Sequence, residues 1–185
     1  MADRFASLSP ELAQWWGEQP VFFVATAPAG DGGHVNLSPK GYDTLRVLAP
    51  DRVAYLDLTG SGVETIAHLR ENGRITLMAC AFNGNPRISR IFGRGTVHET
   101  GTAAFDALAP EFPEFPGRRS IIEVDVEQVT TSCGYAVPLM DLVEERDRLK
   151  QWAETKGEQG VVAYWSSKNR ESIDGLPGLS DSPRE

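Results

Sequence analysis

The chain has 185 residues and a formal net charge of −8, a length that suits one domain with an ordinary hydrophobic core. Hydrophobic residues make up 41% and charged residues 24%, proportions that argue against general disorder and against a membrane protein. The acidic balance opposes binding to nucleic acid, because proteins of that class place a basic face against the phosphates. The early apolar run over 21–25 is too short for a signal peptide or a membrane span, so we expect a cytoplasmic protein.

The first part of the chain predicts strands interrupted by helices. In chain order we expect a short helix over 9–17, a strand over 20–27, a turn over 30–33 leading into a strand over 34–41, a strand over 52–58 and a helix over 61–73. Ser9 as a cap and Pro10 in the first turn mark the start of the first helix. Asn72 and Gly73 mark the end of the second.

The second part continues with long strands and a charged C-terminal region. We expect paired strands over 74–81 and 87–99, a short helix over 101–110, a strand over 120–129 and a helix over 139–156. Gly93 and Gly95 suit a bulge or a close approach to a ligand. We expect residues 1–165 to form the main domain and 166–185 a polar, partly flexible arm with a frayed end.

About six strands with a few inserted helices predict a mainly β (α+β) fold, a closed or partly closed antiparallel barrel. The order of segments NLSPKG, RVAYLDLTGSG, ETIAHLRENG, RITLMACA and RISRIFGRG, within residues 20–130, resembles the pyridoxamine 5'-phosphate oxidase-like FMN-binding split-barrel family. The resemblance implies a six-stranded antiparallel split β-barrel with peripheral helices. It also implies bound FMN and a homodimer in which two subunits share each site.

The segment NLSPKG, residues 36–41, places an amide, a hydroxyl and an ammonium close together. A phosphate or the O2/N1 edge of a flavin ring suits this mixture of donors, and Lys40 resembles the lysine with which the family contacts its cofactor. A cation there would stabilise the negative charge of a reduced ring. The alternative is a lysine on a surface turn after Pro39.

The segment LTGSGVET, residues 58–65, joins a strand to a helix through two glycines. Backbone N–H groups at such a helix start can receive a phosphate. The alternative is a capping box without a ligand, because Ser61 and Glu64 have the S-x-x-E spacing. Family members commonly carry basic residues after the serine, whereas Val63 and Glu64 stand there in this chain. A carboxylate repels a phosphate, so Glu64 must point away or the phosphate must lie nearer Lys40 and an arginine.

Arg87 and Arg90 are the candidates for that arginine, because a guanidinium can grip two phosphate oxygens. Solvated charges on an edge strand are the alternative. Tyr135 and Trp165 lie in Gly-bearing C-terminal segments, which in split barrels often cover the flavin. Ordinary packing at a dimer interface is the competing interpretation for both aromatic residues.

No metal site is expected, because the three histidines, His34, His68 and His98, lack the spacing of a ligand set. Cys80 and Cys133 are far apart and predict reduced thiols.

We therefore expect an FMN-dependent oxidoreductase that exchanges a hydride with a small-molecule substrate. The flavin phosphate is expected at Lys40, Ser61, Thr65 and Arg90, and the ring along residues 36–38 and 57–59. No residue stands out as a catalytic acid or base, which fits a cofactor that supplies the reactive atom. The expected cofactor-binding residues are Asn36, Ser38, Lys40, Gly41, Asp57, Leu58, Thr59, Ser61, Thr65, Arg87 and Arg90. The alternatives are a reductase that uses deazaflavin (F420), a non-catalytic module that binds flavin or haem, and a structural barrel with an empty cleft.

Overall fold

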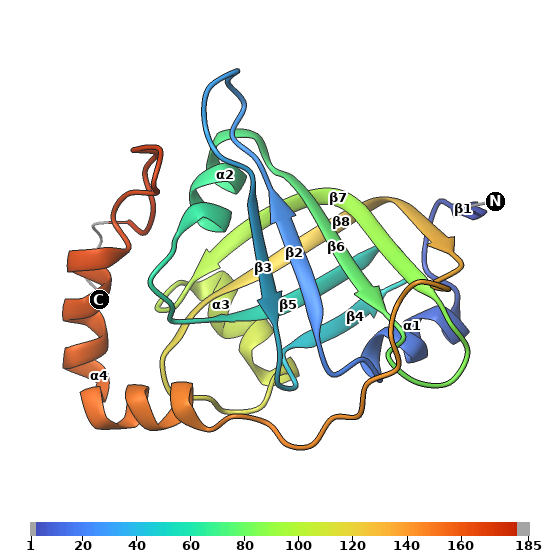
Figure 1. Cartoon of the computed structure of the whole chain (residues 1–185). Helices are drawn as coiled ribbons and strands as arrows, with labels where there is room; N and C mark the ends of the chain where they lie inside the picture. The colour runs from blue at the N-terminus through green and yellow to red at the C-terminus, as the bar shows by residue number, and fades with distance from the viewer. Residues whose placement is uncertain (1–2, 181–185) are drawn as a thin grey trace.

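The computed structural model, which describes residues 3–180, contains one antiparallel sheet curled into a barrel (Figure 1). Its strands among the described residues are β1 (Asp3–Phe5), β2 (Phe22–Thr26), β3 (Asn36–Lys40), β4 (Leu45–Ala49), β5 (Arg52–Leu58), β6 (Arg74–Cys80), β7 (Ile88–Glu99) and β8 (Arg118–Ser132). The strand order is β3-β2-β6-β7-β8-β5-β4, with β1 added beside β8. The mainly β split-barrel prediction is confirmed.

The six expected strands correspond to β2, β3, β5, β6, β7 and β8, and the structure adds β1 and β4. Strand β4 pairs with β5 as a hairpin, with Leu45 opposite Tyr55. All five residues of β4 are half-buried. Leu45 and Val47 lie on one face of β4 and Leu48 on the other, so its sequence lacks the alternation of apolar and polar residues that marks a strand.

The interior of the barrel is filled by side chains that line up across neighbouring strands. Val24 of β2 pairs with Leu77 of β6, which pairs with Ile91 of β7, and all three side chains are fully buried. Ser38 of β3 lies opposite Val24, and paired residues in antiparallel strands point to the same face. Asn36, Ser38 and Lys40 therefore point into the barrel, toward β5 and the first turn of the helix α2.

Gly93 sits at a bulge where the pairing of β7 with β8 shifts register between Phe92 and Gly93. A Cβ atom at Gly93 would collide with the backbone carbonyl of Asp125, so the position admits no side chain. At Gly95 a Cβ would meet the side chain of Leu69 at 2.8 Å. The expected bulge is confirmed, but the close approaches are to the protein itself.

The helices are α1 (Pro10–Gly17), α2 (Glu64–Asn72), α3 (Ala103–Leu108) and α4 (Arg148–Lys168), with a short 3-10 turn at Ala109–Glu111. Ser9 caps α1 by accepting a hydrogen bond from the N–H of Leu12. Gly73 ends α2 with φ of 70°, a conformation that glycine adopts without strain. Both helix signals from the sequence are confirmed.

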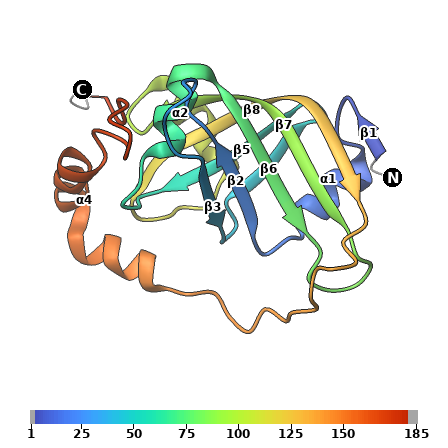
Figure 2. The ribbon, with the colours of Figure 1, turned by 45° about the horizontal axis from the view of Figure 1, so that its top comes forward.

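The prediction of a helix over 139–156 is wrong in its first half. Residues 133–147 form an extended segment that runs along one side of the barrel (Figures 1 and 2), and α4 begins at Arg148. Leu142 and Val143 are 64% and 92% exposed. These apolar side chains do not pack on the barrel, and an amphipathic helix gains most of its stability from such packing.

Helix α4 runs through the expected boundary between residues 165 and 166, and it is kinked at Gly157, where φ is 64°. After it, residues 169–180 fold back against α2 and form what we call the C-terminal strap. Asn169, Ser172 and Leu179 of the strap are buried. The ending that we expected to be frayed falls, apart from Ser180, outside the described residues.

Candidate functional site

The two stretches that the sequence singled out lie side by side in the structure. The Asn36 side-chain amide donates to Thr65 Oγ1 at 2.9 Å and to Thr26 Oγ1 at 3.3 Å. Ser38 Oγ donates to Asn36 Oδ1 at 3.1 Å. Strand β3 is thereby tied to the first turn of α2, and its polar side chains form one continuous row with those of β5 and α2.

Lys40 lies at the other end of this row, in an ion pair with Asp57. Its ammonium is 2.9 Å from Asp57 Oδ1, and Arg119 Nε is 2.7 Å from Asp57 Oδ2. The side chain of Asp57 is only 2% exposed, whereas that of Lys40 is 21% exposed. Burial opposes the charged carboxylate, but the ion pairs with Arg119 and Lys40 outweigh it and hold the pKa of Asp57 far below its usual range. The triad therefore keeps one net positive charge at the open edge of β3.

The buried side chain of His68, on α2, continues the hydrogen bonds that link Asn36 to Thr26. Its Nδ1 is 3.0 Å from Thr26 Oγ1, and its buried Nε2 has no hydrogen-bond partner. Burial lowers the pKa of His68, against the opposing effect of Asp174, Glu64 and Glu71. The ring is therefore held in its neutral form.

The turn between β5 and α2 is occupied by contacts within the chain. Thr59 Oγ1 donates to the carbonyl of Gly117 at 2.7 Å and accepts from Trp165 Nε1 at 2.8 Å. The carbonyl of Gly60 accepts from the side-chain amide of Asn169 at 3.0 Å, and that of Gly62 accepts from Arg119 at 2.9 Å.

The helix start differs from both interpretations of its sequence. Val63 is the N-cap of α2 and makes no side-chain cap, so the capping box of Ser61 and Glu64 is wrong. The Glu64 side chain folds back over the first turn, where a Cβ at Gly62 would collide with its carboxylate. Glu64 Oε1 accepts from the N–H of Ile173 in the strap at 3.3 Å. A carboxylate thus stands beside the N–H groups that were expected to hold a phosphate.

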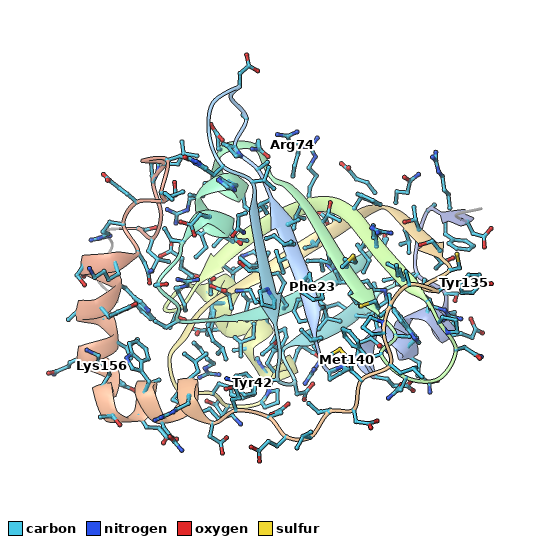
Figure 3. All side chains as sticks on the ribbon, viewed as in Figure 1. Phe23, Tyr42, Arg74, Tyr135, Met140 and Lys156 are labelled. Carbon is cyan, nitrogen blue, oxygen red and sulfur yellow. The ribbon has the colours of Figure 1, made fainter. Side chains whose placement is uncertain are left out.

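Arg87 and Arg90 are not brought to this row of polar side chains. Arg90 is paired with Met78, which is paired with Phe23 of β2. Phe23 points to the outside of the barrel (Figure 3), on the face opposite to Ser38 and Lys40. Arg87 lies over the ring of Trp15, 5.5 Å from its centre.

The other predicted residues lie around this row. Gly41 follows the last residue of β3, and its carbonyl accepts a hydrogen bond from Thr44 Oγ1 at 2.8 Å. Leu58 packs against a smaller group of buried apolar side chains that includes Phe105 of α3. Ser61 is exposed. Tyr135 is 83% exposed and lies on the far side of the barrel from α4 (Figure 3).

One cation of the expected set, Lys40, stays partly open to a ligand and can donate to the polar edge of a flavin ring. Both amide hydrogens of Asn36 and the hydroxyl hydrogen of Ser38 are used within the chain. The start of α2 presents the Glu64 carboxylate instead of a cation. The phosphate ligands expected from the sequence, Lys40, Ser61, Thr65 and Arg90, are not brought together, because Arg90 lies on the outer face of the barrel.

The histidines considered as haem ligands all have polar neighbours in the structure. His34 Nδ1 is 2.6 Å from Asp174, and His98 Nε2 is 2.9 Å from Glu123. His68 is bonded to Thr26.

Sequence reasoning missed Arg119, His68 and Asn169. Asp57 inside an otherwise apolar strand is a signal for a buried ion pair, because an unpaired buried charge is strongly unfavourable. The sequence does not indicate which cation completes the pair, and Arg119 lies 62 residues away. Asn169 carries no local signal, since its partners lie 108 and 109 residues earlier.

Comparison with known proteins agrees with this architecture. The chain is 41% identical to the pyridoxamine 5'-phosphate oxidase family protein ustO of Aspergillus flavus, over 98% of this chain and 79% of that protein. Among solved structures, a putative pyridoxamine 5'-phosphate oxidase from Lactobacillus delbrueckii is 24% identical, with a TM-score of 0.52 over 68% of this chain and 94% of its own. HupZ from Group A Streptococcus is 19% identical, with a TM-score of 0.50 over 66% of this chain and 91% of its own.

The two structural likenesses support the fold alone. The family model described as pyridoxamine 5'-phosphate oxidase matches residues 8–133, which span β2 to β8 and include the row from Asn36 to Thr65. Together with the identity to the Aspergillus protein, this match shows that the chain belongs to the pyridoxamine 5'-phosphate oxidase family.

Proposed function

We propose that this protein binds a flavin with the polar edge of the ring at Lys40 and acts as a flavin-dependent oxidoreductase on a small substrate. The observation that carries the proposal is the partly exposed ammonium of Lys40, which Asp57 holds on the same face of β3 as Ser38. When bound, a flavin supplies hydride transfer without a catalytic side chain from the protein. Family membership supports the same class of function.

The buried carboxylate of Asp57 fixes the position of the Lys40 ammonium. An ammonium has three N–H donors, and the bond to Asp57 uses one of them. Asp57 is itself fixed by Arg119 and by a 3.3 Å hydrogen bond from Ser120. Lys40 is therefore pre-positioned, which reduces the entropy lost when a ligand oxygen binds to it.

The first test is the absorption spectrum of the purified protein and the identity of the chromophore released on denaturation. Flavin titrations then compare the wild type with Lys40→Ala. We expect the substitution to weaken flavin binding by about 1–3 kcal/mol, the range for a hydrogen bond to a charged group. Lys156→Ala, on the exposed surface of α4, is the matched control and should leave the affinity unchanged. Equal affinities for wild type and Lys40→Ala would remove Lys40 from the site.

The same experiment separates the alternatives. A Soret band would favour a haem-binding module. Colourless protein that binds only added deazaflavin would favour a deazaflavin reductase. Anaerobic reduction of the bound ring with NADH, NADPH and reduced deazaflavin in turn would identify the electron donor.

The homodimer implied by the family resemblance is part of the proposal. Strand β3 lies at the edge of the sheet, and Val35 and Leu37 are 75% and 65% exposed there. Exposed apolar residues at a sheet edge support association with a second copy. A monomeric mass by light scattering over a wide concentration range would contradict it.

A further inference from the structure

The row of polar side chains from Lys40 to the start of α2 carries opposite charges at its two ends, and this difference bears on which flavin the protein accepts. We infer that the start of α2 rejects a phosphate, so that the protein recognises the ring end of a flavin and binds unphosphorylated riboflavin at least as tightly as FMN. The inference rests on the proposed flavin site at Lys40. It concerns the opposite end of that site, where Glu64 and the C-terminal strap are the deciding elements.

The first step is the position of the Glu64 carboxylate. The N-terminal N–H groups of a helix attract an anion, and Glu64, the first residue of α2, places its own carboxylate over that turn. A phosphate dianion at the same place would lie against this negative charge and be repelled. The Glu64 carboxylate thus lies at the turn before α2, where a phosphate would approach the helix start.

The second step is the cover that the strap provides. Asn169 is fully buried, and its side-chain amide bonds to the carbonyls of Gly60 at 3.0 Å and Ser61 at 3.2 Å. At Gly178 an added Cβ would lie 2.9 Å from both methyl groups of Val63. The strap therefore packs directly on the turn, with no space between them at these points.

The third step is the use of the basic side chains near the turn. Arg119 is 4% exposed and is bound to Asp57 and to the carbonyl of Gly62. Arg70 donates to the carbonyl of Gly178 and to Glu99, and Arg170 donates to the carbonyl of Leu179 at 3.1 Å. These three arginines hold the turn and the strap in place. Because each is already engaged, the turn lacks the available cations that a phosphate requires.

The experiment compares two ligands that differ only in the phosphate. Apoprotein is titrated with riboflavin and with FMN, following flavin fluorescence at one ionic strength. In the wild type we expect riboflavin to bind at least as tightly as FMN. For Glu64→Gln we expect the FMN affinity to rise about 3- to 10-fold, the effect of removing one like charge, while riboflavin binding stays the same. Glutamine retains an oxygen that can accept from the N–H of Ile173.

Glu71→Gln is the matched control, because it removes the same charge from the other end of α2. Its oxygen likewise remains available to the N–H of Ala29, which now donates to Glu71 at 2.7 Å. We expect both ligands to respond to it equally. If wild-type protein binds FMN ten times more tightly than riboflavin, or Glu64→Gln changes both affinities alike, the inference is overturned while the ring site stands. If neither ligand binds, the proposed flavin site fails and the inference fails with it.

Discussion

The barrel interior and the C-terminal strap are held by different forces. Across β2, β6 and β7 the interior consists of apolar side chains such as Val24, Leu77 and Ile91, each fully buried. The strap buries Leu179, but most of its attachment is polar, through Asn169 to the turn before α2 and through Asp174 to the backbone and ring of His34. Apolar burial is distributed over a whole core, whereas a few hydrogen bonds can open together. We therefore expect the strap to detach at a lower free energy than the barrel unfolds.

The largest effect is expected in the barrel interior. Leu77→Ala should lower the free energy of unfolding by about 2–5 kcal/mol, because it removes apolar contacts and leaves a cavity. The measurement is denaturant unfolding followed by circular dichroism. Leu142→Ala, at a position 64% exposed, should change stability by less than about 0.5 kcal/mol. Similar losses for the two variants would contradict the assignment of Leu77 to the core that stabilises the barrel.

A smaller and local effect is expected in the strap. Asn169→Ala removes the donors to Gly60 and Ser61 and should weaken strap docking by about 1–2 kcal/mol. Hydrogen exchange should accelerate at the amides of Gly178 and Leu179, which now bond within the strap. Exchange at Val24 and Leu77 should stay slow. If all these amides accelerated together, the strap and the barrel would be one cooperative unit.

The smallest effect is a pH dependence from His68, which lies between the two regions. Its folded-state pKa is lowered by burial, whereas an unfolded histidine titrates near pH 6.5. Below about pH 6.5 the unfolded chain therefore binds a proton that the folded chain resists. The stabilising contribution is fully present above that pH and is lost as the pH falls toward the lowered pKa.

Replacement of His68 by glutamine should flatten this slope between pH 7 and pH 5, measured as the free energy of unfolding by denaturant titration. Asp174, Glu64 and Glu71 act on the same ring and oppose the lowering of its pKa. His34→Gln is the comparison variant, since the His34 side chain is 73% exposed. An unchanged slope in the His68 variant would show that this ring does not contribute.

The parts of the fold that sequence reasoning recovered are those determined by local pattern. The β-branched and aromatic run over 20–27 became β2, and the polar alternation of Asn36, Ser38 and Lys40 placed them on one face of β3. Their approach to Asp57 and Thr65 followed from the order of strands in the family. The C-terminal region was harder, because the start of α4 depends on what surface the barrel offers to residues 139–147.

The row of side chains on β3 could be predicted, because Asn36, Ser38 and Lys40 alternate along one short strand and so share a face. Their part in a flavin site stays a prediction. The sequence indicated that Glu64 would repel a phosphate at the start of α2, but it did not indicate where the Glu64 side chain lies. That position depends on the strap, whose Ile173 and Asn169 reach the turn from more than 100 residues away along the chain.

The extended segment between β8 and α4 has a consequence for how copies of the chain combine. It comprises about 15 residues, from the end of β8 at Ser132 to the start of α4 at Arg148, and fully stretched it spans about 50 Å. A tether of this length does not oblige α4 and the strap to dock on the barrel to which they are attached. Two molecules that exchanged these arms would each retain the contacts of Asn169, Asp174 and Leu179, so arm exchange is available to this chain at high concentration.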